Sequence, residues 1–207
     1  MSYDPNDAAR DEFYEQISRE LYPEHRLQAI DEFTAERLSS FYIKYPDVMR
    51  PALEALHEGT ELLSMKRYSP AVVFFVSSIE LFLKATLLKP VVYGLVHHEA
   101  LADIIVTYTL GQTGFERYES LLEDLFAALA KMDIKEISRK DSETKLLIES
   151  KELQKLRNRV IHQGAVCTEA EAKKAFLVSV AVFELIVEPM LGALGLMVQE
   201  GGSVKPA

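Results

Sequence analysis

The points at which helices must break are the feature that most constrains this fold. The 207 residues include only 9 glycines and 8 prolines, and these lie mostly between apolar segments with helical spacing. No alternating polar and apolar run is long enough to predict a sheet, and no internal repeat is present. The sequence therefore predicts an all-α fold, an up-and-down bundle with a core of about four to five helices.

Prolines frame the most apolar segment. Ser69 followed by Pro70 is typical of a helix start, and Lys89-Pro90 is expected to stop the helix. The length of this segment and its caps favour a helix over residues 70–88 rather than a strand. The other early segments expected to be helical are residues 10–21, 24–45, 51–67, 95–110 and 115–131.

Caps define the helix that follows. Asp141 or Ser142 is expected to begin a helix that ends near His162. Gly164 suits the left-handed backbone that closes many helices.

The final helix is expected to start after Thr168, which can form a capping box with Glu171, and to reach the mid-190s with a kink at Pro189. The glycine-rich end of the sequence is expected to be disordered. The expected organisation is an N-terminal helical extension at residues 1–48, a helical bundle at 49–197 and a disordered tail at 198–207.

Charge excludes one broad class of function. Lys and Arg total 23 against 32 Asp and Glu, so the net charge is −9. A negative surface repels nucleic acid at long range, so a protein that coats DNA without sequence preference is not expected. Aromatic and basic residues are also not interleaved as in a platform for stacking single-stranded bases. A local basic site is compatible with this charge.

Cysteine content and hydropathy predict a cytoplasmic protein. Cys167 is the only cysteine, so no internal disulfide or Cys-cluster zinc site is expected. The acidic start of the sequence lacks the pattern of a secretory signal. The apolar stretches at 70–88 and 175–198 contain charged residues, so we expect neither to span a membrane.

Common catalytic signatures are absent from the sequence. It has no Walker-type glycine loop, no GxGxxG, no HExxH and no G-x-S-x-G. His97 and His98 are adjacent, so on a helix their side chains diverge by about 100° and make a poor metal pair. We expect a loop or surface role for both histidines, and no metal or other cofactor.

One arginine falls where an apolar residue belongs. On a helical wheel Arg157 lies inside an apolar arc, between Leu153 and Ile161. An arginine on a core-facing side is costly unless a carboxylate or a phosphate meets it. Asn158 and His162 are four residues apart and therefore neighbour each other at the edge of this arc. Arg159, the residue after Asn158, points away from the arc.

The helix at 70–88 offers a partner for this arginine. Ser77, Glu80 and Lys84 recur at spacings of three and four and make one polar stripe on an apolar helix. The simplest geometry packs the two helices together, with Glu80 holding the guanidinium of Arg157. A purely architectural ion pair is the plain alternative.

The hexapeptide RNRVIH at residues 157–162 resembles the RNxxxH form of the R-x(4–6)-H motif of the HEPN domain family. The polar stripe on an apolar helix and the capped helix after Gly164 are also similar to that family, over roughly residues 50–195. The resemblance implies a compact helical domain of a kind found in many RNA-cleaving toxins and defence proteins.

The resemblance further implies a metal-independent endoribonuclease. Such an enzyme uses the RNA 2′-OH as nucleophile and leaves a 2′,3′-cyclic phosphate and a 5′-OH. A histidine can move protons near neutral pH, and an arginine fork can bind phosphate oxygens. The implied catalytic residues are Arg157, Asn158 and His162, and the supporting ones are Glu80, Ser77, Lys84 and Arg159.

Partners are implied in the same way. Family members typically dimerise and bring two motifs together, so we expect a homodimer acting on RNA. Residues 139–163 hold seven Lys and Arg against four Asp and Glu, which predicts a locally positive cleft. An inhibitory protein partner, as in toxin–antitoxin pairs, is also expected.

Two other interpretations stay open. One is a non-catalytic HEPN-like module that binds a nucleotide, RNA or a partner protein. The other is a helical scaffold in which Arg157 and Glu80 form a structural pair and His162 is favoured by the helix dipole.

Overall fold

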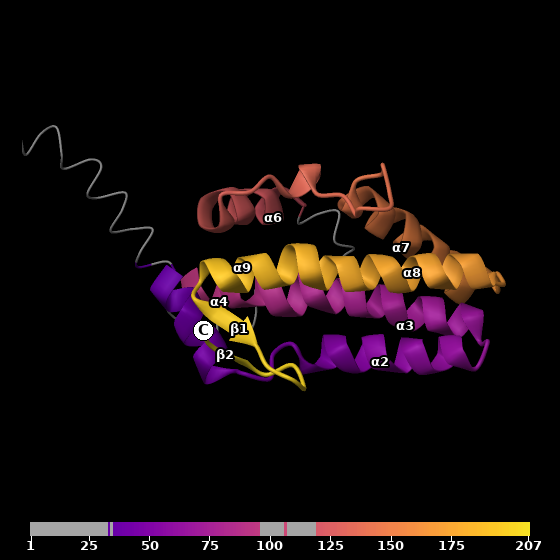
Figure 1. The fold of residues 1–207 in the computed structure, drawn as a ribbon, viewed down its shortest axis with the longest axis horizontal. Coiled ribbons are helices and arrows are strands. Elements are labelled where there is room, and N and C mark those ends of the chain that lie inside the picture. The colour runs from indigo at the N-terminus through magenta and orange to yellow at the C-terminus, as the bar shows by residue number, and fades with distance from the viewer. Residues whose placement is uncertain (1–32, 34, 96–105, 107–118) are drawn as a thin grey trace, which may run out of the picture.

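Long helices lie side by side around one apolar core, as Figure 1 shows. The computed structural model describes residues 33, 35–95, 106 and 119–207, and these are mostly helical. The described elements are helical residues 35–44, α2 (Arg50–Ser64), α3 (Tyr68–Leu81), a π-helical turn (Phe82–Leu88), α4 (Lys89–Leu95), α6 (Glu119–Leu125), a second π-helical turn (Phe126–Ala130), a 3-10 turn (Ile134–Glu136), α7 (Leu146–Gln163), α8 (Glu169–Val182), a third π-helical turn (Phe183–Val187), α9 (Glu188–Ala193), and the strands β1 (Leu196–Val198) and β2 (Val204–Pro206).

The predicted helical character is confirmed for this part of the chain, apart from the short C-terminal hairpin. The expected helix at 10–21 lies outside the described residues, and so does nearly all of the one at 95–110. Residues 35–44 pack into the same core as the later helices, through Leu38, Phe41 and Tyr42.

Helix α3 has a central place in the bundle. It packs against α2, α7 and α8, and its side chains Phe75 and Ile79 are buried. Helix α2 approaches closely because Gly59 has no side chain: a Cβ there would lie 2.7 Å from the ring of Phe75. The buried hydroxyl of Ser78 donates to the carbonyl of Ala52 at 2.8 Å, which satisfies a polar atom inside the core. These contacts hold α3 in place on its α2 side.

The prediction that Lys89-Pro90 stops the apolar helix is wrong. A π-helical turn precedes the proline, and the helix continues as α4 to Leu95. Proline has no N–H to donate to the carbonyl of Thr86, four residues earlier. The hydroxyl of Tyr42 donates to that carbonyl instead, and burial raises the pKa of Tyr42 well above its ordinary value of 10.0. A side chain from residues 35–44 thus replaces the missing backbone donor.

A second proline also follows a π-helical turn. Pro189 lies in α9, directly after the turn Phe183–Val187. Prolines and π-helical turns are both common causes of a bend in a helix, and the sequence predicts a kink here. The ring centroids of Phe82, in the π-helical turn before Pro90, and of Phe183, in the one before Pro189, lie 5.6 Å apart. These two π-helical turns therefore pack on each other.

The caps between α7 and α8 are as the sequence predicts. Gly164 has a φ of 66°, the left-handed backbone that closes α7. The side chain of Thr168 accepts from the N–H of Glu171, and the carboxylate of Glu171 accepts from the N–H of Thr168, which completes the capping box. The turn that joins the end of the motif to α8 is therefore defined at both ends.

Two predicted helix starts are wrong. Helix α3 begins before Ser69, whose hydroxyl accepts the backbone N–H of Cys167 at 2.8 Å. Helix α7 begins at Leu146 rather than at residue 141 or 142. Asp141 and Ser142 lie in the turn that precedes α7. The Asp141 carboxylate accepts from Arg139, and the Ser142 hydroxyl donates to Glu149. Residues of the type that cap helices serve here to bind other parts of the chain: Ser69 a backbone N–H, and Asp141 and Ser142 side chains.

Residues 198–207 differ from the expected disordered tail. Strands β1 and β2 pair in antiparallel fashion, and Gly201 and Gly202 have positive φ values in the turn between them. Val204 is buried, and its N–H donates to the carbonyl of Pro46 at 2.9 Å. The hairpin therefore anchors the end of the chain on the turn after residues 35–44.

Two helical stretches, Tyr68–Gly94 and Glu169–Ala193, are long and apolar enough to cross a membrane by length and composition alone. Of their most apolar windows, 61% and 50% are buried inside the protein. Core helices of soluble proteins pass the same test, so this finding is weak evidence for a membrane span. The expectation that neither spans a membrane stays a prediction.

We predict that Tyr42→Phe destabilises the fold by about 1–3 kcal/mol, because the carbonyl of Thr86 would lose its donor in a buried place. Tyr68→Phe is the matched control, because the Tyr68 hydroxyl bonds to Glu169 in an exposed position and its loss should change stability by less than about 0.5 kcal/mol. Urea unfolding of both variants measures the difference. An equal loss of stability in the two variants would show that the Tyr42 hydroxyl does not replace the missing donor to the carbonyl of Thr86.

Candidate functional site

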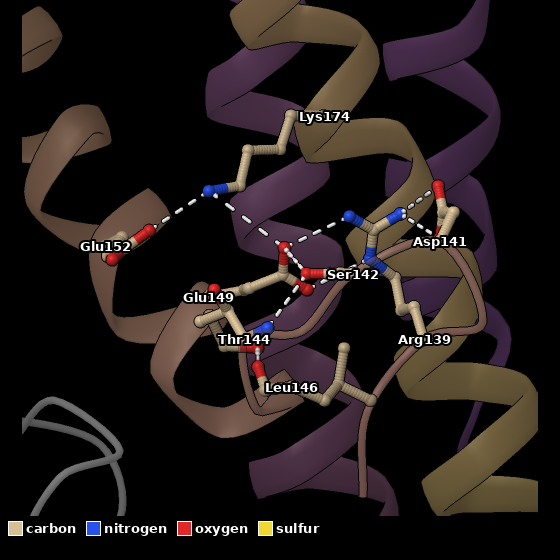
Figure 2. A network of polar contacts seen from close by, with 9 residues as sticks. Arg139, Asp141, Ser142, Thr144, Leu146, Glu149, Glu152 and Lys174 are labelled. Atoms are coloured by element: carbon tan, nitrogen blue, oxygen red, sulfur yellow. Dashed lines mark hydrogen bonds and ion pairs between the residues drawn. The ribbon is translucent and has the colours of Figure 1, made fainter.

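A buried carboxylate fixes the first turn of α7, as Figure 2 shows. Only 2% of the Glu149 side chain is exposed. Its oxygens accept from Arg139 Nε at 2.9 Å and Nη2 at 3.0 Å, and from the hydroxyl of Ser142 at 3.1 Å. Arg139 also donates to Asp141 at 2.9 Å. The turn before α7 is therefore tied to the helix by a two-pronged ion pair.

The same carboxylate faces α8. Lys174 lies 4.0 Å from Glu149 and donates to Glu152 at 3.0 Å (Figure 2). Burial acts to raise the pKa of Glu149, but the hydrogen bonds and charge of Arg139 oppose it, and the net result is a pKa below the ordinary 4.5. Glu149 is thus held ionised between α7, α8 and the preceding turn.

Sequence reasoning missed this cluster, although a signal was present. Glu149 lies three residues after Leu146 and four before Leu153, which places it on the apolar side of α7. A carboxylate at such a position needs a cation, by the same argument that drew attention to Arg157. The sequence does not show that Arg139 supplies this cation, because the turn between Arg139 and α7 has no regular spacing.

The predicted contact between the motif helix and α3 is confirmed. Arg157 Nη2 lies 2.7 Å from Glu80 Oε2. The two side chains are 21% and 18% exposed, so the pair lies at the edge of the core with an opening to solvent. Gln154 donates to the other Glu80 oxygen at 2.9 Å. The sequence analysis missed Gln154, although it lies one helical turn before Arg157 on the same face.

Asn158 holds the guanidinium from the other side. Its side-chain carbonyl accepts from Arg157 Nη1 at 3.1 Å. Arg157 Nε is buried and has no hydrogen-bond partner among the described residues. A guanidinium carries five N–H donors, and the hydrogen bonds of Arg157 to Glu80 and Asn158 use only two of them. Donor capacity for an anion is therefore left on this fork.

His162 lies in the last turn of α7 and is exposed. No hydrogen bond joins its ring to any residue of the described ranges, and the side-chain carbonyl of Asn158, its neighbour on the helix, accepts from Arg157 instead. His162 is five positions after Arg157, which corresponds to about 7.5 Å along the axis and about 140° around it. One α7 helix thus presents the two groups on adjoining sides rather than side by side.

The structure also describes the three other predicted supporting residues, Ser77, Lys84 and Arg159. Ser77 donates to the carbonyl of Val73 at 2.9 Å, within its own helix. Lys84 is half-buried, one turn beyond Glu80. Arg159 is exposed and its charge helps to lower the pKa of Glu171, after the larger effect of hydrogen bonds from Thr168. In the described part of the chain, Arg157 bonds to Asn158 and Glu80 and to none of these three residues.

One residue placed in the apolar arc is in fact exposed. Ile161 has 49% of its surface open, because Val160, about 100° away around the helix, is the residue that packs on the core. An exposed apolar side chain therefore adjoins His162.

The expected positive charge of residues 139–163 is largely neutralised. Four of the seven cations in this segment pair with carboxylates: Arg139 with Glu149 and Asp141, Lys145 with Glu136, Lys151 with Glu119, and Arg157 with Glu80. The face around the motif is therefore less positive than the residue count predicts.

Within residues 33, 35–95, 106 and 119–207, no group of three or more His, Cys, Asp or Glu is placed to hold a metal ion. His97 and His98 lie outside these ranges. Comparison with known family models, with curated proteins and with solved structures finds no match to this chain.

We predict that Glu149→Ala destabilises the protein by about 3 kcal/mol, because it leaves the guanidinium of Arg139 with only the exposed Asp141. Glu152→Ala is the matched control: Glu152 is exposed on the same helix, and loss of its bond to Lys174 should cost less than about 1 kcal/mol. Equal costs would show that the buried cluster does not fix α7.

The same variant tests the pH dependence. The folded pKa of Glu149 is below its unfolded value of 4.5, so its stabilising effect is present above pH 4.5 and is lost as pH falls below that value. Unfolding free energies measured between pH 7 and pH 3 should therefore fall more steeply in the wild type than in Glu149→Ala. Parallel pH profiles would contradict this assignment.

Proposed function

We propose that this chain is a metal-independent endoribonuclease of the HEPN type. The observation that carries the proposal is the Arg157 guanidinium, held at an opening by Glu80 and Asn158, with the exposed imidazole of His162 five positions further along α7. The resemblance of residues 157–162 to the family motif supports the same proposal, as does the helical fold.

The chemistry needs few protein groups. The 2′-OH of RNA attacks the adjacent phosphorus, the bond to the 5′ oxygen of the next nucleotide breaks, and a 2′,3′-cyclic phosphate and a 5′-OH result. His162 takes the proton of the 2′-OH or gives one to the leaving oxygen. Arg157 donates to the non-bridging oxygens as negative charge builds up on them. Asn158 and Glu80 orient the guanidinium.

A second copy of the chain completes the site in this proposal. One chain supplies a single imidazole, whereas the reaction benefits from both a base and an acid. The guanidinium and the imidazole also point to different sides of one α7, so a groove between two α7 helices brings together what one helix separates. The exposed Ile161 beside His162 offers apolar surface for such a contact.

The biological setting follows from the resemblance. A cytoplasmic nuclease of this kind acts in a toxin–antitoxin or defence system, with an inhibitory protein partner that holds it in check. We propose that the enzyme needs no cofactor.

A second candidate function is a non-catalytic module of the same fold that binds a nucleotide, RNA or a protein. The neutralised charge around the motif favours the form that binds a protein, because four of the seven cations in residues 139–163 are already paired with carboxylates and are less available to phosphate groups.

We predict that the purified chain cleaves labelled RNA in the presence of EDTA, and that His162→Ala lowers the rate by at least about 100-fold, because a general acid or base is lost. Arg157→Lys keeps a cation beside Glu80 but removes the planar fork, and it should also lower the rate strongly. Lys155→Ala is the control, because Lys155 is exposed on the same helix and has no role in the proposal.

The outcomes separate the alternatives. His162→Ala should leave the unfolding free energy within about 0.5 kcal/mol of the wild type, because the side chain is exposed. Binding of RNA without cleavage by the wild type would favour the binding module. Absence of both, with Arg157→Ala unfolding the protein, would leave the helical scaffold.

A further inference from the structure

Two donors from α7 hold the carboxylate of Glu80, one at each oxygen. Its Oε2 accepts from Arg157 Nη2 at 2.7 Å, and its Oε1 accepts from Gln154 Nε2 at 2.9 Å. Gln154 and Arg157 are three positions apart and therefore lie on one face of α7. Both side chains, rather than the arginine alone, thus set the orientation of the Glu80 carboxylate.

The pairing of Arg157 with Glu80 differs from that of Arg139 with Glu149. Arg139 meets its glutamate with two prongs, through Nε at 2.9 Å and Nη2 at 3.0 Å (Figure 2), which is a common and strong arrangement. In the described part of the chain, Arg157 donates to Glu80 through Nη2 alone. The same two residue types therefore pair in two different ways on one helix.

The neutral donors at the two carboxylates also differ. The Ser142 hydroxyl shares Oε1 of Glu149 with Arg139. The amide of Gln154 instead takes the oxygen of Glu80 that the arginine does not use. Gln154 is half-buried, so its bond is partly shielded from water and holds the carboxylate turned toward the amide.

The nitrogen that a second prong would use has no partner. Arg157 Nε is buried and makes no hydrogen bond among the described residues. It is joined through a single carbon to Nη2, the nitrogen that contacts Glu80. A buried N–H left unbonded costs free energy, so a carboxylate this close is expected to accept from it. The bond from Gln154 explains why Glu80 does not.

We propose that Gln154 is a positioning residue of the α7 motif. Its amide keeps Glu80 on one nitrogen of Arg157, so that the remaining N–H groups of the fork stay unbonded until a phosphate oxygen arrives. A lysine in this place would compete with the arginine for the carboxylate, and an acidic residue would repel the phosphate; the amide does neither. The use of the fork for phosphate rests on the proposed function, whereas the geometry that Gln154 imposes does not.

The NMR signal of the Arg157 Nε–H group tests this geometry in the full chain. Gln154→Met has a similar length but no donor, so Glu80 should turn and accept from Nε as a second prong. The Nε proton should then shift downfield, toward the position of the Arg139 Nε proton, which already bonds to Glu149. Arg157→Lys assigns the signal, because this substitution removes it.

RNA cleavage by the same variants gives the functional measure. Gln154→Met should lower kcat about tenfold and leave KM within about twofold, because the fork acts on charge that develops in the transition state. Gln163→Met is the matched control: the same substitution at an exposed glutamine of α7 should change neither the signal nor the rate. Circular dichroism checks that each variant folds, and Gln154→Ala replaces Gln154→Met if the latter does not.

The outcomes are distinct. A downfield shift together with the lower kcat supports the positioning role. An unchanged Nε signal in Gln154→Met overturns it, whatever the rate, and so does a shifted signal with the kcat of the wild type. If the wild type cleaves no RNA, the proposed nuclease function fails, and the Nε signal by itself then supports or overturns the positioning of the fork by Gln154.

Discussion

A carboxylate on an otherwise apolar helix is the constraint on which the arrangement of this bundle depends. Glu80 lies on α3, between buried residues of the core, and is only 18% exposed. Such a group is costly without a cation, and Arg157 meets it at 2.7 Å. This contact fixes which face of α7 packs on α3. In the first turn of α7 the buried Glu149 ties the preceding turn to the helix through Arg139. Two ion pairs, about two helical turns apart, thus fix the position of one helix.

The position of α7 decides what is left for function. Because Glu80 and Asn158 hold the guanidinium of Arg157 from two sides, the fork stays at the edge of the core instead of extending freely into solvent. His162 follows in the last turn and is exposed. Gly164 then ends the helix, and the capped start of α8 fixes the chain again. The candidate groups are therefore mounted on a rigid helix, which suits a site that must bind a phosphate in a defined geometry.

The parts of this structure that could be predicted are those with regular spacing. The helical period and the capping box at Thr168 follow from residues three or four apart on one helix. The pairing of Glu80 with Arg157 follows from the place of each residue on the apolar side of its own helix. The prediction at Pro90 failed because the answer lies far away in the chain: Tyr42 supplies the missing donor. The end of the chain differs for a similar reason, since Val204 is buried against a distant turn.

Side-chain partners across irregular segments were beyond sequence reasoning. The cluster at Glu149 depends on a turn without periodicity, and Gln154 became visible only once α3 and α7 were placed together. Long-range contacts, rather than local propensity, account for each of these differences.

The chemistry of the RNA ends after incubation with the pure protein tests the central claim most directly. If the guanidinium of Arg157 and the imidazole of His162 act on a phosphodiester through the 2′-OH, the upstream fragments carry a 2′,3′-cyclic phosphate and the downstream fragments a 5′-OH, as mass spectrometry would show. An RNA with a 2′-deoxy sugar at the cut position should then stay intact. Fragments with a 3′-OH and a 5′-phosphate, or cleavage of the deoxy-substituted strand, would contradict the account.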